Sequence, residues 1–544
     1  MDARKTLRVV LFISLISVSV ASAQEPHQHQ HDATEKLGEV SFPISCRPTA
    51  QQRFNRALAL LHSFQYVEAE SAFAEITASE PDCAMAWWGV AMSLYHPLWV
   101  PPSPAELQKG REAIGRAATA GAKTRREKEY IAALETFYKG ADRLGHWERA
   151  RAYAAAMEGV YRRYPQDREA AIFYALALNG TAPASEKNMA NRTKAAQILY
   201  RVWPHEPDHP GIAHYLIHSY DYPSLARLAL SAARRYARVA PSSAHALHMP
   251  SHIFTRLGMW PDSIQSNIAS AAAAKAKAQP GGATHDELHA MDYLMYAYLQ
   301  GAQDEQAKSI LDKALAFSRA DEVVFQVAFA WTAIPARFAL ERRRWKEAAS
   351  LTLHPAEFPW ERFRYAEANL YFARAVGAAR SGDVDGARQE VEKLASIETA
   401  LSGASAGYDW AKHVRIQRQA AAAWLAMAEG RTGEAEALLR AAGELEDSTD
   451  KHPVTPGAIL PAREMLGDLL LELKQPAQAL KEYEAVLQTA PNRFNSLYGA
   501  ARAAELAGNR QKARAYYKKL TTVSRHATGR RSELQLAKEY LSKN

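Results

Sequence analysis

The sequence predicts an all-α protein built as a helix–turn–helix solenoid, and two observations lead to this fold class. Strand-like alternation of polar and apolar residues is nearly absent, whereas Ala-rich stretches with apolar residues three and four apart run through the chain. The second observation is an internal repeat of 34 residues near the C-terminus, which is the length of one pair of antiparallel helices. Its matched positions are Gly467/Ala501, Ala479/Ala513, Tyr483/Tyr517 and Val486/Leu520.

The composition agrees with a folded protein and excludes several function classes. Of the 544 residues, 48% are hydrophobic and 23% are charged, which is ordinary for a chain with a buried core. Two cysteines are too few for a multi-thiolate zinc or iron–sulfur site. The net charge of +8 is matched by residues 501–544 alone, which hold 11 Lys/Arg and 3 Asp/Glu. This basic C-terminal end is not a stripe along the molecule, so we expect no binding of nucleic acid.

The first element is a predicted signal peptide at residues 1–23. Three basic residues precede the apolar run Val9–Val20, and the small residues Ala21–Ala23 form a cleavage pattern. The apolar run is too short to span a bilayer, and no later stretch is long and apolar enough to do so. We therefore expect a secreted or periplasmic protein without a transmembrane segment after cleavage of the signal.

Residues 24–48 form a linker in which His27, His29 and His31 could hold a metal weakly or act as a solvated spacer. An exported protein meets an oxidising compartment, and Cys46 and Cys83 flank the first predicted helical hairpin. A disulfide between them is favoured over two buried thiols.

The rest of the chain divides into three stretches of helical hairpins. Residues 49–200 hold repeats with insertions at Val100–Pro104 and Gly180–Asn191, residues 201–300 are rich in histidine, and residues 301–544 hold the clearest repeats and the basic end. Proline, glycine and aspartate mark the turns between hairpins.

The C-terminal repeat resembles the tetratricopeptide repeat (TPR) superfamily, in a secreted bacterial-type protein. The positions that carry the resemblance are Leu466, Gly467, Leu470, Ala479, Tyr483, Val486 and Pro491. The resemblance implies a right-handed superhelix whose concave groove is lined by the first helix of each hairpin. It also implies a groove ligand, which could be a small molecule, a peptide or a protein.

The histidines of the central stretch are the strongest functional signal. Nine of the 19 histidines lie within residues 205–292. His214 and His218 are four residues apart, so they share a helix face, and His248 and His252 repeat the same spacing 34 residues later. We predict that the two pairs occupy equivalent positions on neighbouring first helices and face one groove.

Further candidate ligands belong to the same region. His245 lies one helical turn before His248, and His289 and Asp292 lie where the next first helix should face the groove. Pro250, between His248 and His252, removes a helical hydrogen bond, so it either bends the helix and re-aims the imidazoles or simply breaks it. Several tyrosines interleave with the histidines, and Tyr296 is the candidate catalytic residue because it should share a face with Asp292.

These residues predict a metal site on the concave face, with copper favoured and iron or zinc possible. Two helices that each carry His at i and i+4, with one further His for each ion, suit a paired-copper centre that activates oxygen. A metal-dependent oxidoreductase is therefore preferred. The alternatives are a non-catalytic periplasmic scaffold that binds a peptide or partner protein, and a metal-dependent hydrolase. A groove that uses the same histidines only as hydrogen-bond donors, or as packing, also remains open.

Overall fold

A computed structural model of the chain describes residues 35–98, 101–183, 189–403 and 408–543. The predicted signal peptide and the tail with His27, His29 and His31 lie outside the described residues. The chain divides into two units, and the second, Lys36–Asn544, holds all the elements named below.

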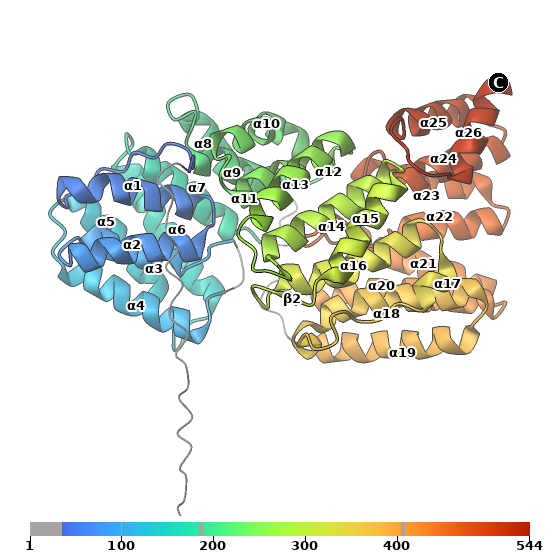
Figure 1. The fold of residues 1–544 in the computed structure, drawn as a ribbon, viewed down its shortest axis with the longest axis horizontal. Helices are drawn as coiled ribbons and strands as arrows, with labels where there is room; N and C mark the ends of the chain where they lie inside the picture. The colour runs from blue at the N-terminus through green and yellow to red at the C-terminus, as the bar shows by residue number, and fades with distance from the viewer. Residues whose placement is uncertain (1–34, 99–100, 184–188, 404–407, 544) are drawn as a thin grey trace, which may run out of the picture. The chain divides into compact units, whose positions relative to one another are not determined.

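The second unit is helical nearly throughout, which confirms the predicted fold class (Figure 1). Its first stretch precedes the histidine-rich residues. The helices are α1 (Pro48–His62), α2 (Tyr66–Ser79), α3 (Ala84–Ser93), α4 (Pro104–Thr119), α5 (Arg125–Tyr138), α6 (His146–Arg163), α7 (Arg168–Gly180) and α8 (Ala190–Val202).

The histidine-rich stretch forms shorter and more interrupted elements. They are α9 (Pro210–Tyr220), the 3-10 helix η1 (Ala226–Ala229), α10 (Leu230–Val239), α11 (Ala244–His248), α12 (Pro250–Arg256), α13 (Trp260–Lys275), β1 (Gly282–Ala283) and α14 (His285–Gln300). The two-residue strand β1 pairs in parallel with β2 (Arg319–Ala320), with Gly282 opposite Arg319 and Ala283 opposite Ala320.

The remaining helices carry the clearest repeats. They are α15 (Asp304–Ala316), α16 (Phe325–Glu341), α17 (Trp345–Ala349), η2 (Trp360–Phe363), α18 (Arg364–Ser381), α19 (Val384–Leu401), α20 (Trp410–Ala428), α21 (Thr432–Asp447), α22 (Ala462–Glu472), α23 (Pro476–Thr489), α24 (Phe494–Leu506), α25 (Arg510–Val523) and α26 (Ser532–Lys543).

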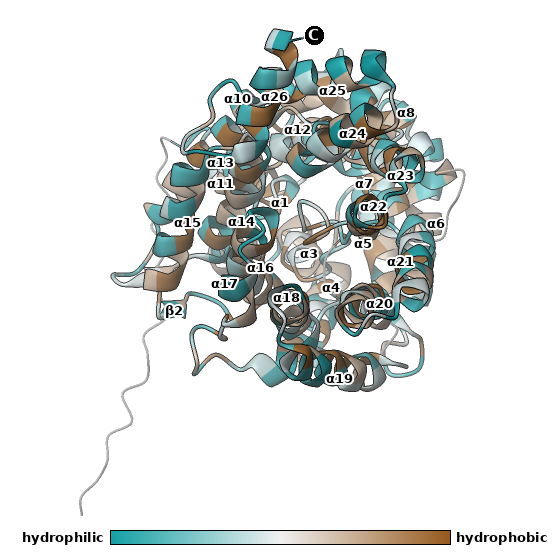
Figure 2. Cartoon of the chain, turned by 90° about the vertical axis from the view of Figure 1, so that its right-hand side faces the viewer, coloured by the Kyte–Doolittle hydropathy of each residue, from teal (hydrophilic) through white to brown (hydrophobic). Residues whose placement is uncertain are grey.

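Each helix packs on the next one in sequence, and the first helices of successive pairs also meet, as α14 does with α16 and α18 with α20. Figure 2 shows hydrophobic and hydrophilic residues following one another on single helices such as α15 and α19. Small residues allow the close approach that the repeat pattern predicts. A Cβ at Gly467 or Gly499 would lie 2.7 Å or 2.3 Å from the ring of Tyr483, so a larger residue at either position would displace the ring.

The central and C-terminal repeats are tied to each other by buried ion pairs. Arg493, at the start of α24, contacts Glu464 and Glu341, at 2.7 Å each, and donates to the hydroxyl of Tyr296 at 3.1 Å. Arg337 of α16 donates to the carbonyl oxygens of Gly457 and Ala458, in the loop between α21 and α22. The loop at residues 448–461 is thereby held against the central helices.

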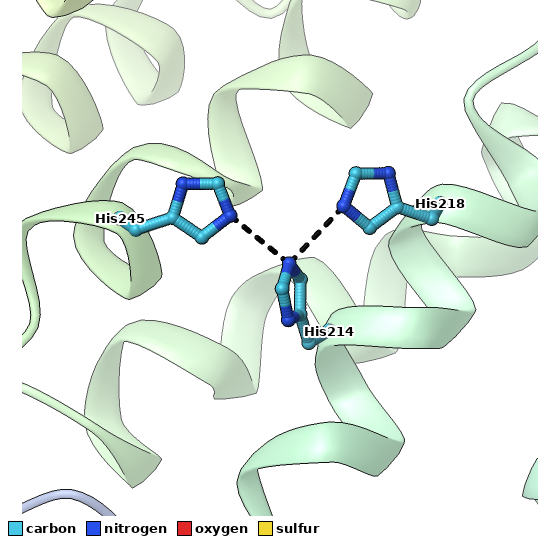
Figure 3. A group of neighbouring side chains, drawn as sticks. All are labelled: His214, His218 and His245. Atoms are coloured by element: carbon cyan, nitrogen blue, oxygen red, sulfur yellow. Dashed lines mark hydrogen bonds between the residues drawn. The ribbon is translucent and has the colours of Figure 1, made fainter. Parts of the chain in front are cut away.

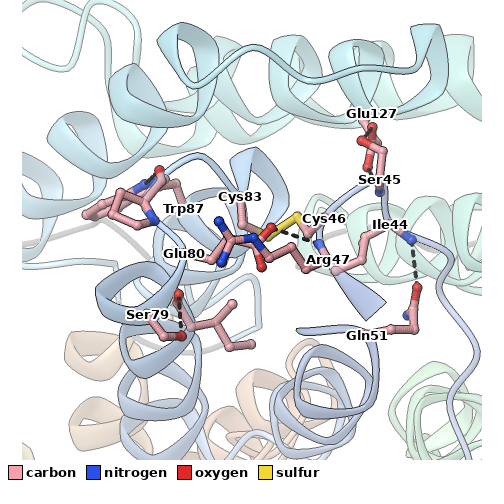
Figure 4. The surroundings of a disulfide bond; sticks show 12 residues. Ile44, Ser45, Cys46, Arg47, Gln51, Ser79, Glu80, Cys83, Trp87 and Glu127 are labelled. Carbon is pink, nitrogen blue, oxygen red and sulfur yellow. Dashed lines mark hydrogen bonds between the residues drawn. A yellow bond between two sulfur atoms is a disulfide. The ribbon is translucent and has the colours of Figure 1, made fainter. Parts of the chain in front are cut away.

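The predicted disulfide between Cys46 and Cys83 is present (Figure 4). Cys46 lies just before α1 and Cys83 is the residue that precedes α3, so the bond fixes the starts of two helices to each other. Nearby, the backbone N–H of Ser45 donates to the Glu127 carboxylate at 2.6 Å. Within the described part of the chain, no helix has both the length and the apolar character needed to cross a membrane.

Candidate metal centre

Three histidines from two helices meet at one point, and we name them the first histidine group. They are His214 and His218 of α9 and His245 of α11 (Figure 3). The Nε2 atom of His214 lies 3.1 Å from Nε2 of His218 and 3.0 Å from Nε2 of His245. The predicted i, i+4 pair therefore converges, and the third imidazole reaches it from the neighbouring helix.

The second histidine group repeats this arrangement one hairpin later. It consists of His248 of α11, His252 of α12 and His289 of α14. The Nε2 atoms of His248 and His252 are 3.0 Å apart, and the ring centroids of His248 and His289 are 4.2 Å apart. In each group, one nitrogen from every ring lies within 4.8 Å of the others.

The two groups adjoin each other. The ring centroids of His218 and His252 are 6.5 Å apart, and so are those of His245 and His248. His245 and His248 are three residues apart, so they lie on one face of the short helix α11, about one turn from each other. His245 therefore belongs to the first group, and His248 belongs to the adjoining second group. The arrangement offers two neighbouring sites with three imidazoles each.

Pro250 interrupts the helix without separating the imidazoles. α11 ends at His248 and α12 begins at Pro250, while Met249 between them keeps helical dihedrals of φ −52° and ψ −36°. The missing N–H of proline breaks the hydrogen-bond ladder, but the i, i+4 geometry of His248 and His252 persists.

Hydrogen bonds to Nδ1 fix the protonation of three of these rings. Nδ1 of His214 lies 2.7 Å from the carbonyl oxygen of His62, and Nδ1 of His248 lies 2.7 Å from Oδ1 of Asn267. Nδ1 of His252 lies 3.0 Å from the carboxylate of Asp221. Because each partner is an acceptor, the proton of each neutral ring sits on Nδ1, and Nε2 carries a lone pair.

Neighbouring residues determine that the side chains of Asn267 and Asp221 accept hydrogen bonds from these histidines. The amide nitrogen of Asn267 donates to the carbonyl oxygen of Ser263 at 2.8 Å, so its oxygen faces His248. Asp221 is paired with Arg256 at 2.8 Å and Lys451 at 3.0 Å; burial would raise its pKa, but these cations and His252 lower it well below its ordinary value. The carboxylate is therefore ionised and accepts.

The consequence is that Nε2 of His248 and Nε2 of His252 face each other at 3.0 Å with no proton between them. Two lone pairs at that distance repel, and a cation between them turns the repulsion into attraction. Imidazole nitrogens bound about 2.0–2.1 Å from one tetrahedral ion lie about 3.3 Å apart. The observed separation needs a change of only a few tenths of an ångström to reach that geometry.

Burial keeps the imidazoles neutral. His248 and His252 are 2% and 3% exposed. Burial, and then the neighbouring histidines, lower the pKa of His214, His245, His248 and His289 well below the ordinary value, and they lower the pKa of His218 to about 3. Neutral imidazole is the form that binds metal.

Two predicted site residues lie elsewhere in the contact network. Asp292 pairs with Arg337 at 3.2 Å rather than with the imidazoles, and burial raises its pKa to about 6 although Arg337 opposes the shift. Tyr296, four residues later on the same face, bonds Arg493. The tyrosine that meets the histidines is Tyr293, four residues after His289, with its hydroxyl 3.2 Å from Nδ1 of His252.

Two other histidines of the central stretch also face away from the groups. His285, four residues before His289, contacts Asp321 and Glu322. His209, just before α9, is buried beside Glu169 at 2.9 Å.

A loop from far along the sequence contacts residues that adjoin the second group. In the loop at residues 448–461, the carbonyl oxygen of Thr455 accepts from Tyr293 at 3.2 Å, and Lys451 reaches Asp221. Asp450 of the same loop pairs with Arg256 at 2.9 Å. No sequence spacing links this loop to the histidines, so sequence reasoning missed it, as it missed Asn267 and Asp221.

No family model matches the chain, and no curated protein matches it. Among solved structures, the chain is similar to the crystal structure of yeast Tom70, at 10% identity and a TM-score of 0.35, over 91% of this chain and 96% of that one. This likeness is too distant to carry an inference about the site.

Proposed function

We propose that the two histidine groups bind a pair of copper ions and that the protein is an exported, metal-dependent oxidoreductase. The observation that carries the proposal is the convergence of Nε2 lone pairs, with His248 and His252 oriented by acceptors on their Nδ1 atoms. Hydrogen-bonded neighbours that orient metal-binding imidazoles are a common feature of such sites.

The donor set favours copper over the other candidates. All six side chains of the two groups are imidazoles, which suit copper, zinc, iron and nickel, and copper(II) binds most tightly of the divalent first-row ions. Carboxylates suit harder ions, and Asp292, the carboxylate among the predicted ligands, forms an ion pair with Arg337. The six-imidazole set therefore supports a redox centre more than a metal-dependent hydrolase.

The burial of the histidines weighs against the alternative of a scaffold that uses them as hydrogen-bond donors for a peptide. His214, His245 and His289 are 0%, 7% and 6% exposed, so a peptide lying in an open groove would not reach their nitrogens. A scaffold that binds partners through other surfaces is the function that would remain if the groups held no metal.

Copper ions in the two groups would supply electron transfer between an oxidisable substrate and dioxygen. The chain's own residues orient the imidazoles, keep them neutral and exclude bulk water, because His248 and His252 are only 2% and 3% exposed. Because the imidazoles are buried, we infer either that the substrates are small or that the loop at residues 448–461 opens to admit them. The disulfide between Cys46 and Cys83 supports the proposed export, since such bonds persist in oxidising compartments.

Copper content tests the centre. His27, His29 and His31 are first replaced by Ala in every sample, so that the tail cannot bind metal. After loading with copper and dialysis, we expect the H289A variant to bind one copper ion fewer per chain than the protein that keeps His289. The matched control H205A removes an exposed histidine and should leave the content unchanged.

Paramagnetic resonance distinguishes a pair from two unrelated ions. Two coupled copper(II) ions should give little signal, and H289A should produce the signal of a single copper(II) ion. A protein that retains no copper would refute the centre. Dioxygen consumption with catechol or ascorbate then tests the activity, and a copper-loaded protein that consumes none would refute the oxidoreductase while leaving the metal centre intact.

A further inference from the structure

A third cluster of potential metal ligands lies outside the two histidine groups. It consists of His62 at the end of α1, Glu169 in the first turn of α7 and His209 just before α9, and we name it the His62 group. Nε2 of His62 lies 3.1 Å from one carboxylate oxygen of Glu169, and Nε2 of His209 lies 2.9 Å from the other. All three side chains are buried.

The donor chemistry differs from that of the copper groups. Two neutral imidazoles and one carboxylate carry one negative charge, which a divalent cation reverses. The two oxygens of the Glu169 carboxylate each face one imidazole, at 3.1 Å for His62 and 2.9 Å for His209. Two histidines and one glutamate, with a fourth position for water, form a recurrent zinc site.

In the metal-free state, Nε2 of each ring donates to the Glu169 carboxylate, so zinc binding through Nε2 requires the proton of each ring to move to Nδ1. Nδ1 of His62 lies 2.9 Å from the hydroxyl of Tyr215, which donates or accepts as required, so His62 is satisfied in either tautomer. Nδ1 of His209 is buried and has no hydrogen-bond partner within the described part of the chain. This atom stays without a protein partner whether or not zinc binds Nε2, so the case for a metal rests on the convergence of the three ligand atoms within 4.8 Å of one another.

The backbone of α9 leaves room for the two rings. A Cβ at Gly211 would lie 2.8 Å from Nδ1 of His62 and 3.2 Å from a ring carbon of His209. Glycine at this position is what allows both imidazoles to approach the first turn of the helix.

The cluster also has an access route. Glu169 lines a cleft of about 750 Å³, with Glu206, Arg126 and Arg168 among the other residues at its wall. A hydrated cation can approach the carboxylate through this cleft, and water can fill the coordination position that the protein leaves open.

We propose that His62, Glu169 and His209 bind a zinc ion in a third metal site, with Nε2 of each histidine and a carboxylate oxygen as ligands. The site is separate from the proposed copper pair, but it is joined to it through His62, whose carbonyl oxygen accepts from Nδ1 of His214. Zinc at this position anchors the end of α1, and with it the acceptor that orients His214.

Zinc content tests this site independently of the copper proposal. The double variant H214A/H248A removes one ligand from each histidine group, and zinc alone is the probe. We expect this protein, with the tail histidines also replaced, to retain one zinc ion per chain. Adding E169Q should abolish zinc binding, whereas the matched control E206Q changes a carboxylate of the same cleft that pairs with Arg168 and should retain it.

Each outcome is decisive for one of the two proposals. Zinc that is absent from the double variant, or that persists with E169Q, overturns the third site. One zinc ion in the double variant together with no copper in the unchanged protein supports the third site and refutes the copper pair.

A second measurement uses the unchanged sequence and covers the case in which the double variant does not fold. A crystal of the zinc-loaded protein, measured at the zinc absorption edge, should show an anomalous peak about 2.0–2.2 Å from Nε2 of His62, Nε2 of His209 and a Glu169 oxygen. A well-ordered cluster without that peak overturns the proposal.

Discussion

Asn267 and Asp221 show at the scale of single residues how neighbouring imidazoles become ligands. Each accepts a hydrogen bond from Nδ1 of one histidine of the second group, and the acceptor decides which nitrogen keeps the proton. Without these acceptors, His248 and His252 could satisfy each other with one shared hydrogen bond. With them, both Nε2 atoms face the same point as lone pairs.

Replacing the acceptor of His248 tests this role. N267L keeps the branching of the side chain but removes the oxygen that receives the Nδ1 proton, so we expect metal affinity to fall about 10–100-fold. A competition titration against a chelator of known affinity measures the change. The matched control N369L removes a buried amide that bonds Thr332 and Gln417, and equal losses in both variants would contradict the proposed role.

Tyr293 and Tyr296 form a second matched pair. The hydroxyl of Tyr293 lies beside His252, and that of Tyr296 accepts from Arg493. We expect Y293F to alter the absorption spectrum of the copper-loaded protein, whereas Y296F should leave it unchanged and reduce the free energy of unfolding by about 1 kcal/mol. A spectrum that responds to Y296F and not to Y293F would restore Tyr296 as the candidate catalytic residue.

At the scale of elements, the site depends on where helices begin and end. α11 and α12 are parts of one helix interrupted at Met249, and the interruption preserves the i, i+4 pair on which the second group depends. The disulfide acts similarly at the other end of the unit, because it links the starts of α1 and α3, and α1 ends at His62. The position of His62 then determines the acceptor for His214.

Removing the disulfide should loosen this arrangement. Cys46 and Cys83 are 37 residues apart, and closing a loop of that length stabilises a protein by about 4 kcal/mol in the chain-entropy model. We expect C46S/C83S to lower the free energy of unfolding in denaturant by about that amount. The unchanged protein treated with a reductant should behave like the variant, and a variant as stable as the oxidised protein would contradict the expectation.

At the scale of the whole molecule, many histidines are buried in neutral form, and this makes stability depend on pH. Burial lowers the pKa of the six imidazoles of the two groups in the folded state, to about 3 for His218, whereas the unfolded chain titrates near 6.5. The unfolded chain therefore binds more protons below pH 6.5. The contribution of these buried neutral histidines to the free energy of unfolding is fully present above pH 6.5. It is lost as the pH falls from 6.5 toward the pKa values of the folded state.

The size of the effect follows from this linkage. Between pH 7.5 and pH 5.5, each such histidine costs about 1.4 kcal/mol of the free energy of unfolding. We expect the metal-free protein to lose several kcal/mol over this interval, measured by denaturant unfolding, and H218Q to lose about 1.4 kcal/mol less. The control H205Q should match the unchanged protein, and an equal stability at both pH values would contradict buried neutral imidazoles.

Several features were predictable from the sequence alone. Ala-rich periodicity and the 34-residue repeat predict the all-α solenoid, because local spacing determines which helix face is apolar. The same repeat placed His214 and His218 in register with His248 and His252, and it brought His245 and His289 into the set. The sequence was sufficient to predict that these histidines lie near one another, because they lie on consecutive hairpins.

Only the tertiary structure decided what surrounds them. Tyr293 rather than Tyr296 meets the imidazoles because the face of α14 is set by its packing on α13 and α16. The loop at residues 448–461 and His62 come from more than 150 residues away, and no local pattern encodes a contact at that separation. Local spacing therefore determines which side chains share a helix face, whereas long-range packing determines which acceptors orient them, and orientation is what makes an imidazole a ligand.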